Sequence, residues 1–359
     1  MTSQDAAGRL APGATARTAK QTIIVVTVAG AAILLAVLVW SFPDVFLLAF
    51  GSVLVAILLR SLIDAVRARL SLSEGLALTL VLAVLVTLTA LSTWLLAARV
   101  SAQTNEFLDT LPRGLEELRR WAAQFGVVQT IEWRSPSMSG WLTSSSVLHR
   151  LTDTFSTIAG VVIDAVAVLV VAIYLAASPR VYVEGSLCLI PSEQRARIRD
   201  VFRRLSSTLR WWILGRIGLM ALNAVSTTVG LWLLGVPFAL TLGILSGLLN
   251  FIPNVGPILA AAPAMLIALT QGPTQALYVA VLYVAYQSAD GYLLTPLVTQ
   301  QTVSVPPAIT LLAQLLLGAS VGLYGLLLAS PLVAASLVIV RMLYVEDVLG
   351  EDKVDAADG

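Results

Sequence analysis

The chain has 359 residues, of which 58% are hydrophobic and 12% charged, with a formal net charge of +1. Soluble domains carry roughly 25% charged residues, so most of this chain cannot form an ordinary water-facing surface. The balanced charge excludes a basic nucleic-acid-binding surface, and the single cysteine, Cys188, excludes an internal disulfide framework or a multi-cysteine metal site. These features predict an all-α polytopic membrane protein.

Eight hydrophobic segments follow a basic tail of residues 1–21, at 22–41, 44–63, 75–98, 155–178, 212–235, 238–270, 274–294 and 307–342. About 20 apolar residues suffice for one crossing. The first segment is longer than a signal-peptide core and lacks an evident cleavage site, so we expect a retained membrane helix. The sixth and eighth are too long for single straight crossings. Each is either a tilted, broken helix or a re-entrant hairpin.

Basic residues in the connections predict the orientation. Arginines occur in the N-terminal tail, in 64–74 and in 179–211, whereas the connections around Pro43 and at 235–237 have no basic residue. The N-terminus and residues 179–211 are therefore predicted to be cytoplasmic. An even number of crossings then places the acidic tail, residues 343–359, in the cytoplasm as well.

Two connections contain amphipathic helical patterns. In the extracytoplasmic stretch 99–154, an amphipathic helix precedes a polar loop. Two interpretations of this helix stay open: it lies at the membrane surface, or it packs on a neighbouring subunit. The cytoplasmic connection 179–211 predicts a second amphipathic helix, with arginines on its polar face.

No enzymatic signature is present. The sequence lacks G-x-S-x-G, H-E-x-x-H and the phosphate-binding P-loop, and its one histidine, His149, is interpreted as structural. We therefore predict that the chain is not an enzyme, binds no metal or other cofactor and is not itself driven by ATP.

The region 212–342 has the most distinctive composition. Between Ile217 and Val340 there is no lysine or arginine and one acid, Asp290. Proline and glycine interrupt the apolar sequence at Phe251–Pro257. A break at membrane depth is tolerated where it is buried in protein or lines a watery cavity, so we predict a solute pathway here. Its candidate residues are Asn250, Pro253, Asn254, Gly256, Pro257, Gln287, Asp290, Pro296, Gln314 and Pro331.

Three charges inside apolar segments are candidates for ion coupling: Asp164, Arg216 and Asp290. Inserting such a charge costs at least about 2.5 kcal/mol, which makes it a functional candidate by default. Asp164 is interpreted either as a proton or cation relay or as the structural partner of Arg216. Asp290 either takes part in transport or reaches to the membrane interface. The neutral amides either bind solute or join helices.

Four motifs in the C-terminal half carry a family resemblance: Leu234-Gly235-Val236-Pro237, Ile252-Pro253-Asn254-Val255-Gly256-Pro257, Gln287 with Asp290-Gly291 and Pro296, and the glycines 318, 322 and 325 before Ala329-Ser330-Pro331-Leu332. At these motifs the chain resembles the autoinducer-2 exporter family of bacterial membrane proteins. Gln300-Gln301 and Pro306 depart from the family pattern, which often has a glycine and a basic residue, and a histidine, there.

The resemblance implies a homo-oligomeric transporter of the bacterial inner membrane, in contact with lipid and a small solute. The first functional hypothesis is export of a small solute, such as an autoinducer-2-like quorum signal or a related metabolite, through the broken helices. The alternative is a sodium/proton antiporter that uses the intramembrane aspartates, since some relatives are described as such. The third hypothesis is a membrane scaffold without transport activity.

Overall fold

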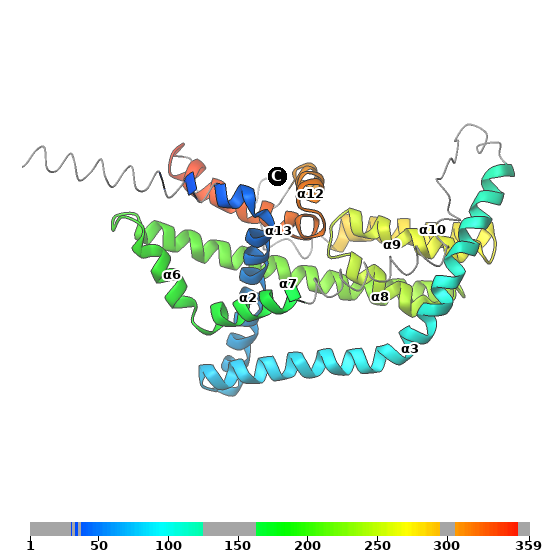
Figure 1. Cartoon of the computed structure of the whole chain (residues 1–359), viewed down its shortest axis with the longest axis horizontal. Coiled ribbons are helices and arrows are strands. Elements are labelled where there is room, and N and C mark those ends of the chain that lie inside the picture. Colours follow the sequence, from blue (N-terminus) through cyan, green and yellow to red (C-terminus); the bar gives the residue numbers. More distant parts are fainter. Residues whose placement is uncertain (1–29, 31–32, 35–36, 125–162, 295–305, 351–359) are drawn as a thin grey trace, which may run out of the picture. The chain divides into compact units, whose positions relative to one another are not determined.

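The computed structural model describes residues 30, 33–34, 37–124, 163–294 and 306–350 (Figure 1). Every regular element in these residues is a helix, which confirms the all-α class. The chain divides after Leu48 into a short N-terminal unit and a larger unit. In the N-terminal unit, residues 37–41 are helical and exposed. The remaining description concerns the larger unit and the helix that leads into it.

Helix α2 (Pro43–Leu70) begins where proline presets the helical φ angle and Asp44 faces the positive helix end. Helix α3 (Glu74–Gln124) follows after a short turn at Ser71. Leu59 and Ile63 of α2 pack with Ala77 of α3 and with Ala172 in the helix Ile163–Ala177. Arg60 ties the turn together through Asp64, at 3.2 Å, and Glu74.

Helix α3 is a single element of 51 residues. The amphipathic pattern after residue 98 is helical as far as Gln124, and this helix continues from the membrane segment without a break. No proline interrupts the sequence from Glu74 to Thr110. Farther along, α3 packs on α9 of the same chain, where Gly114 lies against the backbone of Leu266.

The fourth hydrophobic segment is sharply bent. Its helix Ile163–Ala177 is followed by α6 (Pro179–Cys188) at an angle of 82°. Helix α7 (Arg195–Leu233) then combines the arginine-rich connection and the fifth segment in one helix of 39 residues. Arg199 of α7 pairs with Glu184 of α6 at 2.9 Å, which fastens the two helices together on the polar side.

The sixth segment is broken, as its sequence predicts. Helix α8 (Ala239–Leu249) packs antiparallel to α7, with Gly247 against Met220 and Ala224, and Gly243 against Thr228. Helix α9 (Val255–Leu269) packs on α8 and on α10 (Pro273–Ala289), which passes into the π-helix η2 (Asp290–Leu294). Figure 1 shows these helices side by side. One apolar core joins them and includes Leu231, Leu242, Ala264 and Val279.

The eighth segment is broken at a single residue. Helix α12 (Pro307–Val321) meets α13 (Leu323–Val340) at Gly322, whose φ of 70° and ψ of −138° suit glycine alone. The two helices pack against each other. The π-helix η3 (Arg341–Glu346) follows and takes in residues assigned above to the acidic tail. Arg197 holds this end through Glu346 at 2.8 Å and Asp347 at 2.9 Å.

Among the described residues, four helices are long and apolar enough to cross a membrane, or up to five if the bent pair is one span. Helices α8, α9 and α12 are apolar but shorter, with 11, 15 and 15 residues. At 1.5 Å per residue they extend roughly 16–23 Å, less than the hydrocarbon thickness of about 30 Å. Their lengths favour re-entrant arms over straight crossings for these parts of the sixth and eighth segments.

A candidate site at the helix break

The turn between α8 and α9 is fixed by a buried arginine from α7. Arg216 Nε donates to the carbonyl of Phe251 at 3.1 Å, and its Nη2 donates to the carbonyl of Asn250. Trp212, one turn earlier, packs edge-on against Phe251 with ring centroids 6.0 Å apart. Carbonyls at the end of a helix lack intrahelical partners and carry partial negative charge, so a cation is stabilising there. This explains why one arginine is buried in an apolar segment.

Two amides hold the same turn from opposite helices. Asn250 Nδ2 donates to the carbonyl of Leu219 on α7 at 3.4 Å. Gln314 Nε2 on α12 donates to the carbonyl of Pro253 at 3.0 Å. Both side chains are 1% exposed. The α8–α9 turn is therefore held by α7 on one side and by α12 on the other.

The conformation of the turn depends on two residues of the predicted motif. Asn254 has a positive φ of 65°, an angle that asparagine tolerates better than most residues. A Cβ on Gly256 would lie 1.9 Å from the carbonyl oxygen of Leu249. Only glycine therefore allows the start of α9 to approach the end of α8 this closely, and Pro257 is buried directly after it.

A second hydrogen-bond network joins α7 to α8. Ser246 Oγ donates to Asn223 Oδ1 at 2.8 Å, and Thr227 Oγ1 donates to the same oxygen at 3.0 Å. Asn223 is completely buried. The hydroxyl of Tyr286 on α10 lies near Asn223, beside this network, without a hydrogen bond of normal geometry to it.

Asp290 lies where α10 passes into η2, a π-helical turn of a kind frequent at functional sites. It is 7% exposed. Its carboxyl interacts electrostatically with the Arg216 guanidinium and with the Tyr286 hydroxyl. The lone acid of the apolar region thus lies near the buried Arg216, and the opposite charges partly offset the cost of burying them.

We call these six side chains the polar cluster: Arg216, Asn223, Asn250, Tyr286, Asp290 and Gln314. Among the described residues, five buried side-chain atoms have no protein hydrogen-bond partner, and all belong to this cluster: Asn223 Nδ2, Asn250 Oδ1, Tyr286 Oη, Asp290 Oδ1 and Gln314 Oε1. Leaving a buried polar atom unpaired costs about 1–3 kcal/mol. Such a concentration in one place is typical of a site that binds something other than the protein itself.

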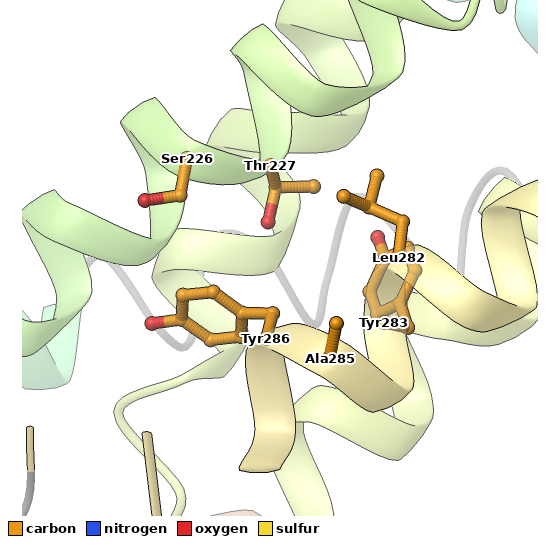
Figure 2. A pocket seen from close by; sticks show the side chains of 6 residues that line it. All are labelled: Ser226, Thr227, Leu282, Tyr283, Ala285 and Tyr286. Atoms are coloured by element: carbon orange, nitrogen blue, oxygen red, sulfur yellow. The ribbon is translucent and has the colours of Figure 1, made fainter. Parts of the chain in front are cut away.

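A cavity of about 180 Å³ adjoins the polar cluster between α7 and α10. Figure 2 shows Ser226 and Thr227 on the α7 side and the rings of Tyr283 and Tyr286 on the α10 side. Thr227 and Tyr286 border both the cavity and the cluster. Leu282 and Ala285 complete a largely apolar wall.

The structure brings together several residues that the sequence singles out. Asn250, Arg216, Gln314 and the carbonyl of Pro253 meet at the turn that Asn254, Gly256 and Pro257 shape, and Asp290 interacts electrostatically with Arg216. No group of three or more histidine, cysteine, aspartate or glutamate side chains suited to a metal occurs in the described part of the chain.

Other predicted residues lie elsewhere. Asp164 is not the partner of Arg216, because it accepts a hydrogen bond from the hydroxyl of Tyr324. Gln287 is exposed on α10, although it lies only three residues from Asp290. Pro331 is buried within α13, a helix that packs on α7. Pro296 lies outside the described residues.

Sequence reasoning missed Asn223 and Tyr286. Their signal was available: Asn223 and Thr227 recur at a spacing of four in an apolar stretch, which puts both on one face of α7. Tyr286 and Asp290 repeat this spacing on α10. A tyrosine in an apolar segment more often marks a membrane interface, so it gives no such indication by itself.

The sequence pattern of AI-2E family transporters matches residues 23–344. The chain belongs to the AI-2E transporter family. This confirms the family predicted from the motifs around the break, and it makes the chain a multi-pass membrane protein of a transport family.

Three relatives carry names that describe them as candidate transport proteins. YueF of Bacillus subtilis is 25% identical over 250 residues, 66% of this chain and 67% of YueF. YhhT of Escherichia coli K12 is 26% identical over 263 residues, 71% of this chain and 73% of YhhT. YrrI of Bacillus subtilis is 32% identical over 146 residues, 41% of each chain.

Proposed function

We propose that this AI-2E transporter exports a small polar solute through the polar cluster at the α8–α9 turn. The supporting observation is the set of five unpartnered buried atoms in this cluster, two of which belong to the amides that hold the turn. Broken helices present free helix ends to solutes and ions, which is a recurring way of building a transport site. A scaffold without transport activity would have no use for unpaired polar atoms at this depth.

The solute is found by comparing metabolites. Cells that contain the wild-type protein, cells without it and cells with Pro253→Ala/Gly256→Ala are grown in parallel, and untargeted metabolite profiles of cells and medium are measured. We expect at least one small polar compound, an autoinducer-2-like signal or a related metabolite, to appear in the medium with the wild type alone. Purified protein in liposomes should then release that compound. Equal release by the double variant would remove the turn from the mechanism.

A second candidate function is sodium/proton antiport. The observation that favours it is the carboxyl of Asp290, which is buried and has one unpartnered oxygen beside those of two amides. Sodium-dependent pH relaxation in proteoliposomes should then be lost in Asp290→Asn and kept in Asp164→Asn, whose carboxyl is already bonded to Tyr324. Loss in Asp164→Asn with retention in Asp290→Asn would reverse this assignment. Transport of neither solute nor ions would leave the scaffold hypothesis.

We also propose the bacterial inner membrane as the location, with both termini in the cytoplasm. Residues 179–211, predicted to be cytoplasmic, contain the only cysteine of the chain, Cys188, which is exposed. A membrane-impermeant maleimide should label it in inverted vesicles and not in intact spheroplasts. The reverse pattern would overturn the orientation. Homo-oligomerisation, which the resemblance implies, is checked on the same purified protein by light scattering.

A further inference from the structure

From the hydrogen-bonding groups that the polar cluster leaves unused, we infer that it accepts small solutes that carry hydrogen-bond donors and are neutral or positively charged, and that it rejects anions. This inference rests on the proposed function and adds the chemical class of the solute.

The first argument is the orientation of the two amides. Asn250 donates a hydrogen bond from its side-chain nitrogen to the carbonyl of Leu219. Gln314 does the same to the carbonyl of Pro253. Because a carbonyl accepts and never donates, these contacts fix which end of each amide points to the backbone. The oxygens, Asn250 Oδ1 and Gln314 Oε1, are left without a protein partner. Both amides therefore present an acceptor to the site.

The remaining groups of the cluster complete this pattern. Asp290 Oδ1 is a third unpartnered acceptor and belongs to a carboxyl group. Asn223 supplies a donor, since its oxygen already accepts from Ser246 and Thr227 while Nδ2 has no partner. The hydroxyl of Tyr286 either donates or accepts. A solute with two or more hydroxyl or amino groups satisfies three acceptors and one donor, whereas a carboxylate or phosphate has no donor for the acceptors.

The second argument is charge. Arg216 is already committed to the carbonyls of Asn250 and Phe251, and it lies beside the opposite charge of Asp290. From Ile217 to Val340 the sequence contains no lysine, arginine or histidine. An anion bound here would therefore lack a free positive partner from this region. Burying an unpaired charge costs several kcal/mol, so discrimination against anions is strong.

The cavity shares Tyr286, and no other side chain, with the polar cluster, and it serves as a guide to the size of the probes. Its volume of about 180 Å³ and its wall of Leu282, Tyr283, Ala285 and Tyr286 suit a short carbon chain (Figure 2). Three four-carbon probes share three hydroxyl groups and differ at one end of the chain: erythritol is neutral, its 4-amino-4-deoxy analogue is a cation at neutral pH, and erythronate is an anion.

The test measures release of the three labelled probes from proteoliposomes at equal concentration. Erythritol and the amino analogue should leave about tenfold faster than erythronate, which should stay at the rate of protein-free liposomes. In Asp290→Asn, which removes the negative charge of the cluster, release of the cationic analogue should fall relative to release of erythritol. Ser288→Ala, which removes a hydroxyl bonded within its own helix, is the control and should behave as wild type.

Release of erythronate at the rate of the other probes, or release of none of them, would overturn the inference. The metabolite comparison keeps this failure separate from failure of the proposed function. Exported compounds that turn out to be anions would contradict the charge selection and leave export intact. No difference between wild type and the double variant would contradict export itself.

Discussion

The two broken segments of the C-terminal half, α8–α9 and α12–α13, are alike in composition and differ in what surrounds the break. The α8–α9 turn, Asn250–Asn254, is bound by Arg216 and Gln314, and two of the five unpartnered atoms, Asn250 Oδ1 and Gln314 Oε1, belong to amides that hold it. The α12–α13 break is one residue, Gly322, and a Cβ there would meet nothing within 4 Å. Breaking an apolar helix is thus insufficient to create a site. The turn also needs polar groups from neighbouring helices.

The largest effect should follow from removing the cation that holds the α8–α9 turn. Arg216→Leu deletes hydrogen bonds to two carbonyls and leaves Asp290 without its opposite charge. We expect a loss of about 3 kcal/mol in the free energy of unfolding and no transport. Thermal unfolding in detergent and proteoliposome flux measure the two effects. Arg210→Leu, an exposed arginine on the same helix, is the matched control, and equal damage in both would contradict the assignment.

The next largest effect compares the two breaks, each of which is changed by adding one methyl group. Gly256→Ala forces a Cβ to within 1.9 Å of the Leu249 oxygen. We expect the free energy of unfolding to fall by about 2 kcal/mol and transport to be lost. Gly322→Ala strains a backbone with φ of 70° and should lower the free energy of unfolding by about 1–2 kcal/mol, while transport persists.

Gly218→Ala, in the middle of α7 with nothing within 4 Å of the added methyl, should stabilise slightly and serves as the control. If Gly322→Ala abolished transport at normal stability, the contrast between the two breaks would be lost.

The smallest expected effect concerns a single amide. Gln314→Leu removes the hydrogen bond to the Pro253 carbonyl and one acceptor of the polar cluster, so we expect about 1 kcal/mol lower stability and several-fold slower flux. Gln271→Leu removes a comparable bond, from Gln271 Nε2 to the Gly235 carbonyl at 3.2 Å, outside the cluster. Its flux should equal that of the wild type. Equal slowing in both variants would mean that any loop contact is sufficient to produce the effect.

Hydropathy and proline placement predicted the fold class and the break at Phe251–Pro257, because both are local properties of the chain. They did not predict that α3 and α7 each run through a supposed boundary. The change from apolar to amphipathic sequence at these places indicates a change in the environment of the side chains, whereas the helical backbone continues. The partners of Arg216 could not be predicted either, since every residue has a backbone carbonyl and the sequence does not show which of them accepts a hydrogen bond.

Part of the candidate site was visible for the opposite reason. Asp290, Gln314 and Asn250 are conspicuous as polar residues in apolar surroundings, and the structure brings them to one turn. Gln287 was equally conspicuous but is exposed. Its spacing of three residues from Asp290 does not decide whether it faces the core, because the core contacts of the helix are unknown from the sequence.

The Arg197 contacts have a consequence for anyone who prepares this protein. Arg197 joins the start of α7 to Glu346 and Asp347, some 150 residues later, and also donates to the Met342 carbonyl at 2.7 Å. A chain cut after Val340 would keep the whole of α13 and lose every one of these partners. An affinity tag or a fluorescent fusion is therefore best attached beyond Gly350, where it leaves this closure of the chain undisturbed.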